Sequence, residues 1–79
     1  MKVKDLKENE VIHCKTKEQF GKIIALNPKN HCVADAWNYE ELNTCYYPKG
    51  YNNTGSHDSI EYYRNSGYTI YQAEQFLDF

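Results

Sequence analysis

Apolar side chains recur at helical spacing in the segment TKEQFGKIIALNP, which begins at Thr16. Thr16 and Gln19 lie three residues apart, which is the spacing of a capping box at the start of a helix. The pair Asn27-Pro28 indicates where the helix ends, because a residue that precedes proline avoids the α conformation. The pattern therefore predicts one amphipathic helix, whose buried face holds three residues at i, i+3, i+4 spacing: Phe20, Ile23 and Ile24.

Four other segments favour strands. The first is EVIHC (Glu10–Cys14), with two β-branched residues at its centre. The second is HCVADAW (His31–Trp37), in which the small side chains alternate with other residues. The third is NTCYYP (Asn43–Pro48), and we expect it to form a hairpin with the second through a loop of about four to six residues. The fourth is YTIYQ (Tyr68–Gln72).

A second helix is predicted over SIEYYRNSG. Asp58 or Ser56 can cap its start, and Glu61 completes a capping box if Asp58 is the cap. Gly67 is typical of a helix end, since glycine takes up the left-handed conformation without a penalty. The last segment, AEQFLDF, predicts a final helical turn that packs two apolar residues: Phe76 and Leu77.

These elements follow one another in the order β-α-β-β-α-β-α. The order predicts an α+β fold, in which a sheet of about four strands is covered by two to three helices. The chain has 79 residues, so we expect a single domain over residues 1–79 with a thin core. A small core is often supplemented by association, and a homo-oligomer is therefore one expectation.

Charge and composition narrow the classes of partner. The formal net charge is −2, and the lysines near the N-terminus alternate with acidic residues, so duplex DNA is not an expected partner. No run of apolar residues is long enough to span a membrane, and the N-terminal segment lacks the apolar run of a signal peptide. We therefore expect a cytoplasmic protein, or one in the cytoplasm of a host cell if a phage encodes it. The three cysteines are expected to be free thiols in that compartment.

Two kinds of chemistry were considered for the cysteines and histidines. A nucleophile needs a nearby base and an orienting acid, as Cys45, His57 and Asp58 would supply in a small hydrolase. A zinc site needs four converging ligands, but no local spacing brings two of the candidates together. We expect neither chemistry, hence no enzyme, metal or cofactor. His57 is expected near a helix N-terminus. Three cysteines are expected in the core, and they could line one side of the sheet if their strands are neighbours: Cys14, Cys32 and Cys45.

Tyrosine is the most informative residue type in the chain. There are eight tyrosines, and three of them lie in the turn-rich segment TCYYPKGYNNTGSHDS, residues 44–59. Tyrosine combines a large rigid contact area with a hydrogen-bonding tip, and it is enriched in recognition surfaces. The sequence thus predicts a binding surface around this segment, made of eight residues: Trp37, Tyr39, Tyr46, Tyr47, Tyr51, Asn53, His57 and Tyr63.

The C-terminal half carries a spaced pattern of aromatic, glycine and apolar residues: Trp37, Thr44, Cys45, Tyr62, Tyr63, Gly67, Tyr68, Ile70, Phe76 and Leu77. In this pattern it resembles small, mostly uncharacterised proteins of bacteriophages and mobile elements. The resemblance implies a phage origin and a role in host takeover or counter-defence. The expected function is therefore that of a small non-enzymatic binding protein that engages a host protein or sequesters a nucleotide-like molecule. A small Cys/His hydrolase or zinc-binding protein is the alternative.

Overall fold

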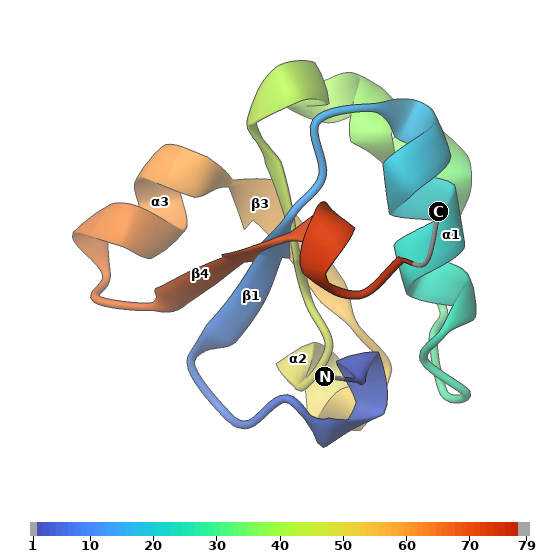
Figure 1. The fold of residues 1–79 in the computed structure, drawn as a ribbon. Helices are drawn as coiled ribbons and strands as arrows, with labels where there is room; N and C mark the ends of the chain where they lie inside the picture. The colour runs from blue at the N-terminus through green and yellow to red at the C-terminus, as the bar shows by residue number, and fades with distance from the viewer. Residues whose placement is uncertain (1, 78–79) are drawn as a thin grey trace.

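The fold is built on a four-stranded mixed sheet. The computed structural model describes residues 2–77. The strands are β1 (Glu10–His13), β2 (Thr44–Tyr47), β3 (Ser56–Ser59) and β4 (Thr69–Gln72), in the spatial order β3-β2-β1-β4 (Figure 1). β2 is antiparallel to both β1 and β3, whereas β1 and β4 run parallel. The predicted α+β class and the four-stranded sheet are thus confirmed.

Strand register assigns the side chains to two faces. Tyr46 lies opposite Ile12 on one side and opposite His57 on the other, so these three share a face. Cys45 lies opposite His13 and Asp58, which places that set on the other face. The alternation follows from the two-residue period of a strand.

The larger core lies on the face that carries Ile12 and Tyr46. Helix α1 (Lys17–Ala25) covers this face with the three apolar residues predicted for it. Three 3-10 turns complete the layer: η1 (Val3–Asp5), η2 (Ala34–Tyr39) and η4 (Ala73–Gln75). η4 is the final helical turn that the sequence predicts, and Phe76 and Leu77 pack against the core. Residues 78–79 of the predicted segment lie outside the described residues.

A smaller core lies on the opposite face. Helix α3 (Ile60–Asn65) places Tyr63 against Val11 and Cys45, and half-buried tyrosines surround this cluster. Figure 1 shows α3 and α1 on opposite sides of the sheet. The sheet is therefore covered on both faces, but by unequal layers.

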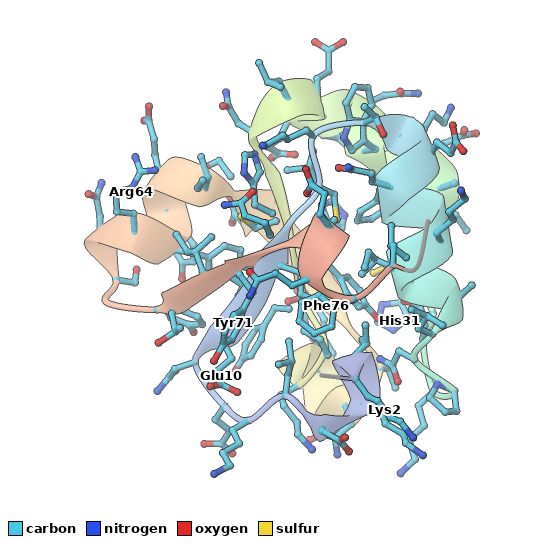
Figure 2. All side chains as sticks on the ribbon, in the orientation of Figure 1. Lys2, Glu10, His31, Arg64, Tyr71 and Phe76 are labelled. Carbon is cyan, nitrogen blue, oxygen red and sulfur yellow. The ribbon has the colours of Figure 1, made fainter. Side chains whose placement is uncertain are left out.

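The first and the last strand of the sheet pair with each other. Glu10 lies opposite Thr69, and the hydroxyl of Tyr71 donates a hydrogen bond to Glu10 Oε2 at 3.1 Å (Figure 2). The ring of Tyr71 also meets Phe76 edge to face, with a centroid distance of 6.1 Å. These contacts fix the C-terminal strand in its register beside β1.

Side-chain caps begin both main helices. Thr16 Oγ1 accepts a hydrogen bond from the N–H of Gln19 at 3.0 Å, as its sequence predicts. α3 begins after Ser59, whose Oγ accepts from the N–H of Tyr62 at 3.2 Å. The prediction of Asp58 or Ser56 as the cap is wrong, because residues 56–59 pair with β2 and the chain turns into the helix only after them.

The predicted strand over His31–Trp37 is also wrong. Asn30 closes a local turn there, since its Oδ1 accepts from the N–H of Cys32 at 3.1 Å and its Nδ2 donates to the Cys32 carbonyl at 2.8 Å. The chain then enters η2, where Trp37 Nε1 donates to the Cys14 carbonyl at 3.0 Å. Asparagine side chains compete with regular backbone pairing in this way. β3 takes the place of that strand, so the hairpin joins β2 to β3 instead.

The tip of the β2–β3 hairpin is a short turn, α2 (Gly50–Asn53). Its residues Tyr51, Asn52 and Asn53 have φ values of 49°, 59° and 74°. Three successive non-glycine residues in the left-handed region are rare and cost free energy. A further 3-10 turn, η3 (Glu41–Asn43), precedes β2. Within residues 2–77, no helix is long and apolar enough to cross a membrane.

Candidate functional site

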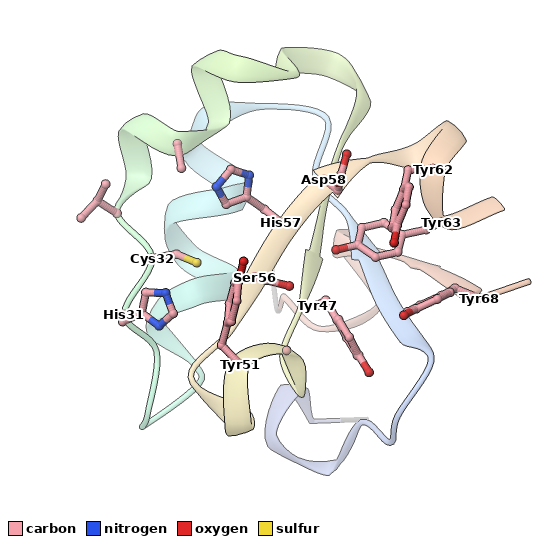
Figure 3. Close-up of a pocket in the computed structure, with 13 residues that line it drawn as sticks. His31, Cys32, Tyr47, Tyr51, Ser56, His57, Asp58, Tyr62, Tyr63 and Tyr68 are labelled. Atoms are coloured by element: carbon pink, nitrogen blue, oxygen red, sulfur yellow. The ribbon is translucent and has the colours of Figure 1, made fainter. Parts of the chain in front are cut away.

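A groove of about 520 Å³ crosses the exposed edge of the sheet at β3. Strand order leaves β3 without a neighbour on its outer side. Figure 3 shows four tyrosines gathered on one side of β3 and a second group, with His31, Cys32 and His57, on the other. The groove therefore draws residues from both faces of the sheet and from the hairpin tip.

The first wall is a cluster of tyrosine rings. Tyr63 packs against Tyr68 at a centroid distance of 4.9 Å, and Tyr47 meets Tyr68 edge to face at 5.3 Å. Tyr62 joins the cluster through Tyr63 at 5.2 Å and remains 53% exposed. Burial raises the pKa of Tyr63, so its hydroxyl stays protonated, and it is hydrogen-bonded to the Ser56 side chain. These rings form a rigid aromatic wall with one exposed member.

The second wall comes from the segment before η2 and from the hairpin tip. The rings of His31 and Tyr51 lie 5.9 Å apart at an interplanar angle of 55°. Tyr51 is 73% exposed, and its left-handed backbone conformation is part of the turn that places it beside the groove (Figure 3). The main-chain N–H of His31 donates to the Thr54 carbonyl at 2.9 Å, which holds this segment against the tip.

The floor of the groove is the edge strand itself. The N–H of Cys14 donates to the carbonyl of Thr44, so Thr44 bonds toward β1. Successive residues of an antiparallel strand bond to opposite neighbours. By this alternation and the register of β2 with β3, the peptide groups of His57 and Ser59 point away from the sheet. The N–H of Ser59 already donates to Asp58 Oδ1 at 2.7 Å. Within residues 2–77, the N–H and C=O of His57 are the outward pair of β3 without a main-chain partner.

The His57 ring lies on the other side of its own strand. It meets Phe20 edge to face at 6.2 Å and lies nearly parallel to Tyr39 at 6.3 Å, with an angle of 17°. Among the described residues, its buried Nδ1 has no hydrogen-bond partner. His57 precedes the N-cap of α3 by two residues, as expected from its place before that helix, but it belongs to β3 and its ring packs against Phe20 and Tyr39.

The groove is nearly uncharged. Asp58 is its one carboxylate, and neither lysine nor arginine lines it within the described part of the chain. An anionic group would therefore meet a carboxylate without a compensating cation, which is unfavourable in a half-buried site. The groove suits an uncharged, ring-shaped group with hydrogen-bonding edges.

The structure brings together half of the predicted surface. Four of the eight residues line the groove: Tyr47, Tyr51, His57 and Tyr63. Tyr39 is 82% exposed and lies next to the groove through its contact with His57. Asn53 lies at the far end of the hairpin tip, where its carbonyl accepts from Asn27 Nδ2 at 3.3 Å.

Two predicted surface residues pack against the larger core, one of them fully buried. Tyr46 has no exposed surface, and its hydroxyl donates to Asn30 Oδ1 at 2.7 Å and accepts from Asn27 Nδ2 at 2.9 Å. Trp37 packs against the larger core and bonds the Cys14 carbonyl. Placing Tyr46 on the binding surface was wrong, whereas Trp37 is half-buried and does not line the groove.

Sequence reasoning missed several residues of the groove. Of the adjacent pair Tyr62 and Tyr63, the first is the exposed one, although the second was chosen. Tyr68 and Ser56 were assigned only to a strand and a helix start. His31 carries no local signal for this site, because the turn at Asn30 and the contact with Thr54 bring it there.

The hydrolase and zinc hypotheses do not match this geometry. Cys45 and Asp58 share one face of the sheet, whereas His57 is on the other, so the base cannot reach the thiol. Burial also raises the pKa of Cys45 to about 12, which keeps it a thiol. The prediction that the cysteines line one side is wrong, since Cys14 and Cys32 belong to the core opposite Cys45. All three are free, and residues 2–77 hold no cluster of three or more His, Cys, Asp or Glu residues able to bind a metal.

No protein-family model matches this chain, and neither a curated protein nor a solved structure matches it significantly.

Proposed function

We propose that this chain is a small non-enzymatic binding protein whose groove at β3 takes the base of a nucleoside or nucleotide. The observation that carries the proposal is the unpaired N–H and C=O of His57 between two aromatic walls. A nucleobase edge presents neighbouring donors and acceptors, and its faces stack on aromatic side chains. The volume of about 520 Å³ lies in the range of small-molecule sites.

The charge of the groove defines how such a ligand would bind. Because Asp58 is the carboxylate of the groove and no lysine or arginine offsets it among the described residues, the phosphate on the sugar of a nucleotide would remain outside. The ring would contact Tyr51 on one side and Tyr62 on the other. The proposed role is sequestration of a nucleotide-like molecule of the host, in line with the bacteriophage resemblance of the C-terminal half.

An extended peptide from a partner protein is the second candidate. Such a peptide adds a strand to a free sheet edge and binds through several main-chain hydrogen bonds. Here the Thr54 carbonyl and the Ser59 N–H are already occupied, which leaves the two groups of His57. Two main-chain bonds support a small planar ligand better than a peptide strand.

Titration of the purified protein with nucleosides tests the proposal. We expect adenosine, guanosine, cytidine or uridine to shift the amide resonance of His57 and to bind with measurable heat. Tyr51→Ala and Tyr62→Ala should each weaken binding by about 5- to 160-fold, since stacking on one ring contributes about 1–3 kcal/mol. Leu42→Ala is the matched control, because Leu42 is 61% exposed and lies outside the groove.

Two results would contradict the proposal. One is the absence of heat and of shifts at His57 with all four nucleosides. The other is an equal loss of affinity in Leu42→Ala and in Tyr51→Ala. Binding of an extended peptide to the β3 edge, with no response to nucleosides, would favour the second candidate.

A further inference from the structure

A second cavity, of about 200 Å³, lies where three distant segments of the chain meet. Lys4 comes from η1, Lys29 follows α1, and Lys49 leads into α2. We call this the lysine cavity. It shares no lining residue with the groove at β3, so the inference that follows does not depend on the proposed function.

The charge of the lysine cavity is uniformly positive. No aspartate or glutamate lines it among residues 2–77. The ion pairs of the described residues involve other lysines, namely Lys15, Lys17 and Lys22. Three lysines thus line one small space that no carboxylate lines, in a chain whose formal net charge is −2. Positive charges gathered in this way attract an anion.

The walls of the lysine cavity are held in place before any ligand arrives. Asn27 Nδ2 donates to both Tyr46 Oη and the Asn53 carbonyl, at 2.9 and 3.3 Å. The N–H of Lys29 in turn donates to Asn27 Oδ1 at 3.2 Å. One asparagine therefore ties the segment after α1 to the core and to the hairpin tip. Pro28 and Pro48 stiffen the rim, since proline fixes its own φ.

The size of the lysine cavity limits what it can bind. Its volume of about 200 Å³ is below the range of about 300–1,000 Å³ that is usual for drug-sized ligands. It has room for one compact anionic group. Lysine ammonium groups bind phosphate oxygens through charge-assisted hydrogen bonds, and three lysines suit a tetrahedral dianion.

From this arrangement we propose that the lysine cavity binds a phosphate group. The phosphate is either free inorganic phosphate or the terminal group of a larger phosphomonoester. Both present the same oxygens to the three ammonium groups. In the second case the remainder of the ligand would lie outside the cavity, because the volume holds the phosphate alone.

Nuclear magnetic resonance with inorganic phosphate tests the proposal. Sodium phosphate is added to the full chain in a phosphate-free buffer at constant ionic strength. We expect saturable shifts of the amides of Lys4, Lys29 and Lys49. The double variant K29Q/K49Q should bind phosphate at least 10-fold more weakly. The double variant K15Q/K17Q removes the same net charge at a different place and should bind as the wild type does.

Further arms distinguish the source of the phosphate and the two sites. A phosphomonoester such as ribose 5-phosphate that binds more tightly than inorganic phosphate would identify the larger ligand as the source. A nucleoside without phosphate should leave the three lysine amides unchanged, whatever it does at the groove. Shifts that do not saturate, that spread over all surface lysines, or that weaken equally in K15Q/K17Q would overturn the proposal.

Discussion

Tyr46 lies where the larger core meets the segments that follow α1. Its ring meets Phe20 edge to face at 6.0 Å, and its hydroxyl bridges the side chains of Asn27 and Asn30. Asn27 lines the lysine cavity, and Asn30 forms the turn before η2. Tyr46, which the sequence places on a surface, therefore links the larger core to the segments that follow α1.

Removing the Tyr46 hydroxyl should be costly. Tyr46→Phe removes two hydrogen bonds, one with Asn27 Nδ2 and one with Asn30 Oδ1, and a net contribution of about 0.5–1.5 kcal/mol for each gives a loss of about 1–3 kcal/mol. We expect the free energy of unfolding to fall by about that amount, as measured by urea denaturation. Tyr39→Phe is the control, because Tyr39 is 82% exposed, and it should change stability by less than about 0.5 kcal/mol. Equal effects of the two changes would disprove the bridging role.

At the scale of elements, a glycine in α1 and a glycine before β3 differ in whether the structure tolerates a side chain there. Gly21 lies inside α1, where an added Cβ would meet Ala34 Cβ at an ordinary 3.9 Å. Gly55 has a φ of +93°, and an added Cβ there would overlap the Tyr46 hydroxyl and approach Tyr46 Cε1 to 2.7 Å. The same substitution should therefore have opposite signs at the two positions.

Thermal and urea unfolding of two alanine variants test this difference. Gly21→Ala should raise the free energy of unfolding by about 0.5–1 kcal/mol, because alanine favours the helix and restricts the unfolded chain. Gly55→Ala should lower it by about 2 kcal/mol or more, from backbone strain and overlap together. A stabilising Gly55→Ala would show that the loop around Tyr46 is not as closely packed as described.

The elements differ in how far the sequence foretells them. All the sequence features that predict α1 lie close together: its cap, its apolar stripe and the proline that follows fall within thirteen residues. The prediction of this helix is confirmed. β3 consists of Ser-His-Asp-Ser and has no apolar residue, because it forms an edge whose side chains are all half-buried. Its strand conformation comes from pairing with β2. No local pattern predicts such a strand.

The sequence predicts only the part of the candidate site that lies within one segment. Tyr47 and Tyr51 lie within the tyrosine-rich segment that the sequence singles out, and both line the groove. Tyr68 reaches it from elsewhere in the chain through the pairing of β1 with β4, and His31 reaches it through the turn at Asn30 and the bond of its N–H to the Thr54 carbonyl. Composition identifies a surface of the right chemistry, but only the register of the sheet determines which rings face one another.

At the scale of the whole molecule, buried protons link stability to alkaline pH. Burial raises the pKa of Tyr46 to about 12 and that of Cys45 to about 12, and it also raises the pKa values of Cys14 and Tyr63. These groups lie in both cores. In the unfolded chain they lose their protons near pH 8.5–10, before the folded chain does.

Stability should therefore be lost as the pH rises. A raised pKa in the folded state stabilises the fold fully below the unfolded pKa, and the benefit disappears between the unfolded and folded values. For Tyr46 that interval is about pH 10 to 12, with a slope of up to about 1.4 kcal/mol per pH unit. Urea denaturation at pH 8, 10 and 11 should show the decline, and it should be shallower in Tyr46→Phe. A pH-independent stability over this range would contradict the buried state of these groups.

The parallel pairing of β1 with β4 has a consequence for the order of folding. Residues 10–13 bond to residues 69–72, so this pairing closes a loop of about 60 residues. Contacts between residues so far apart in the sequence form more slowly than local ones. The hairpin of β2 and β3 can therefore form first, and we expect the pairing of β1 with β4 to complete the sheet.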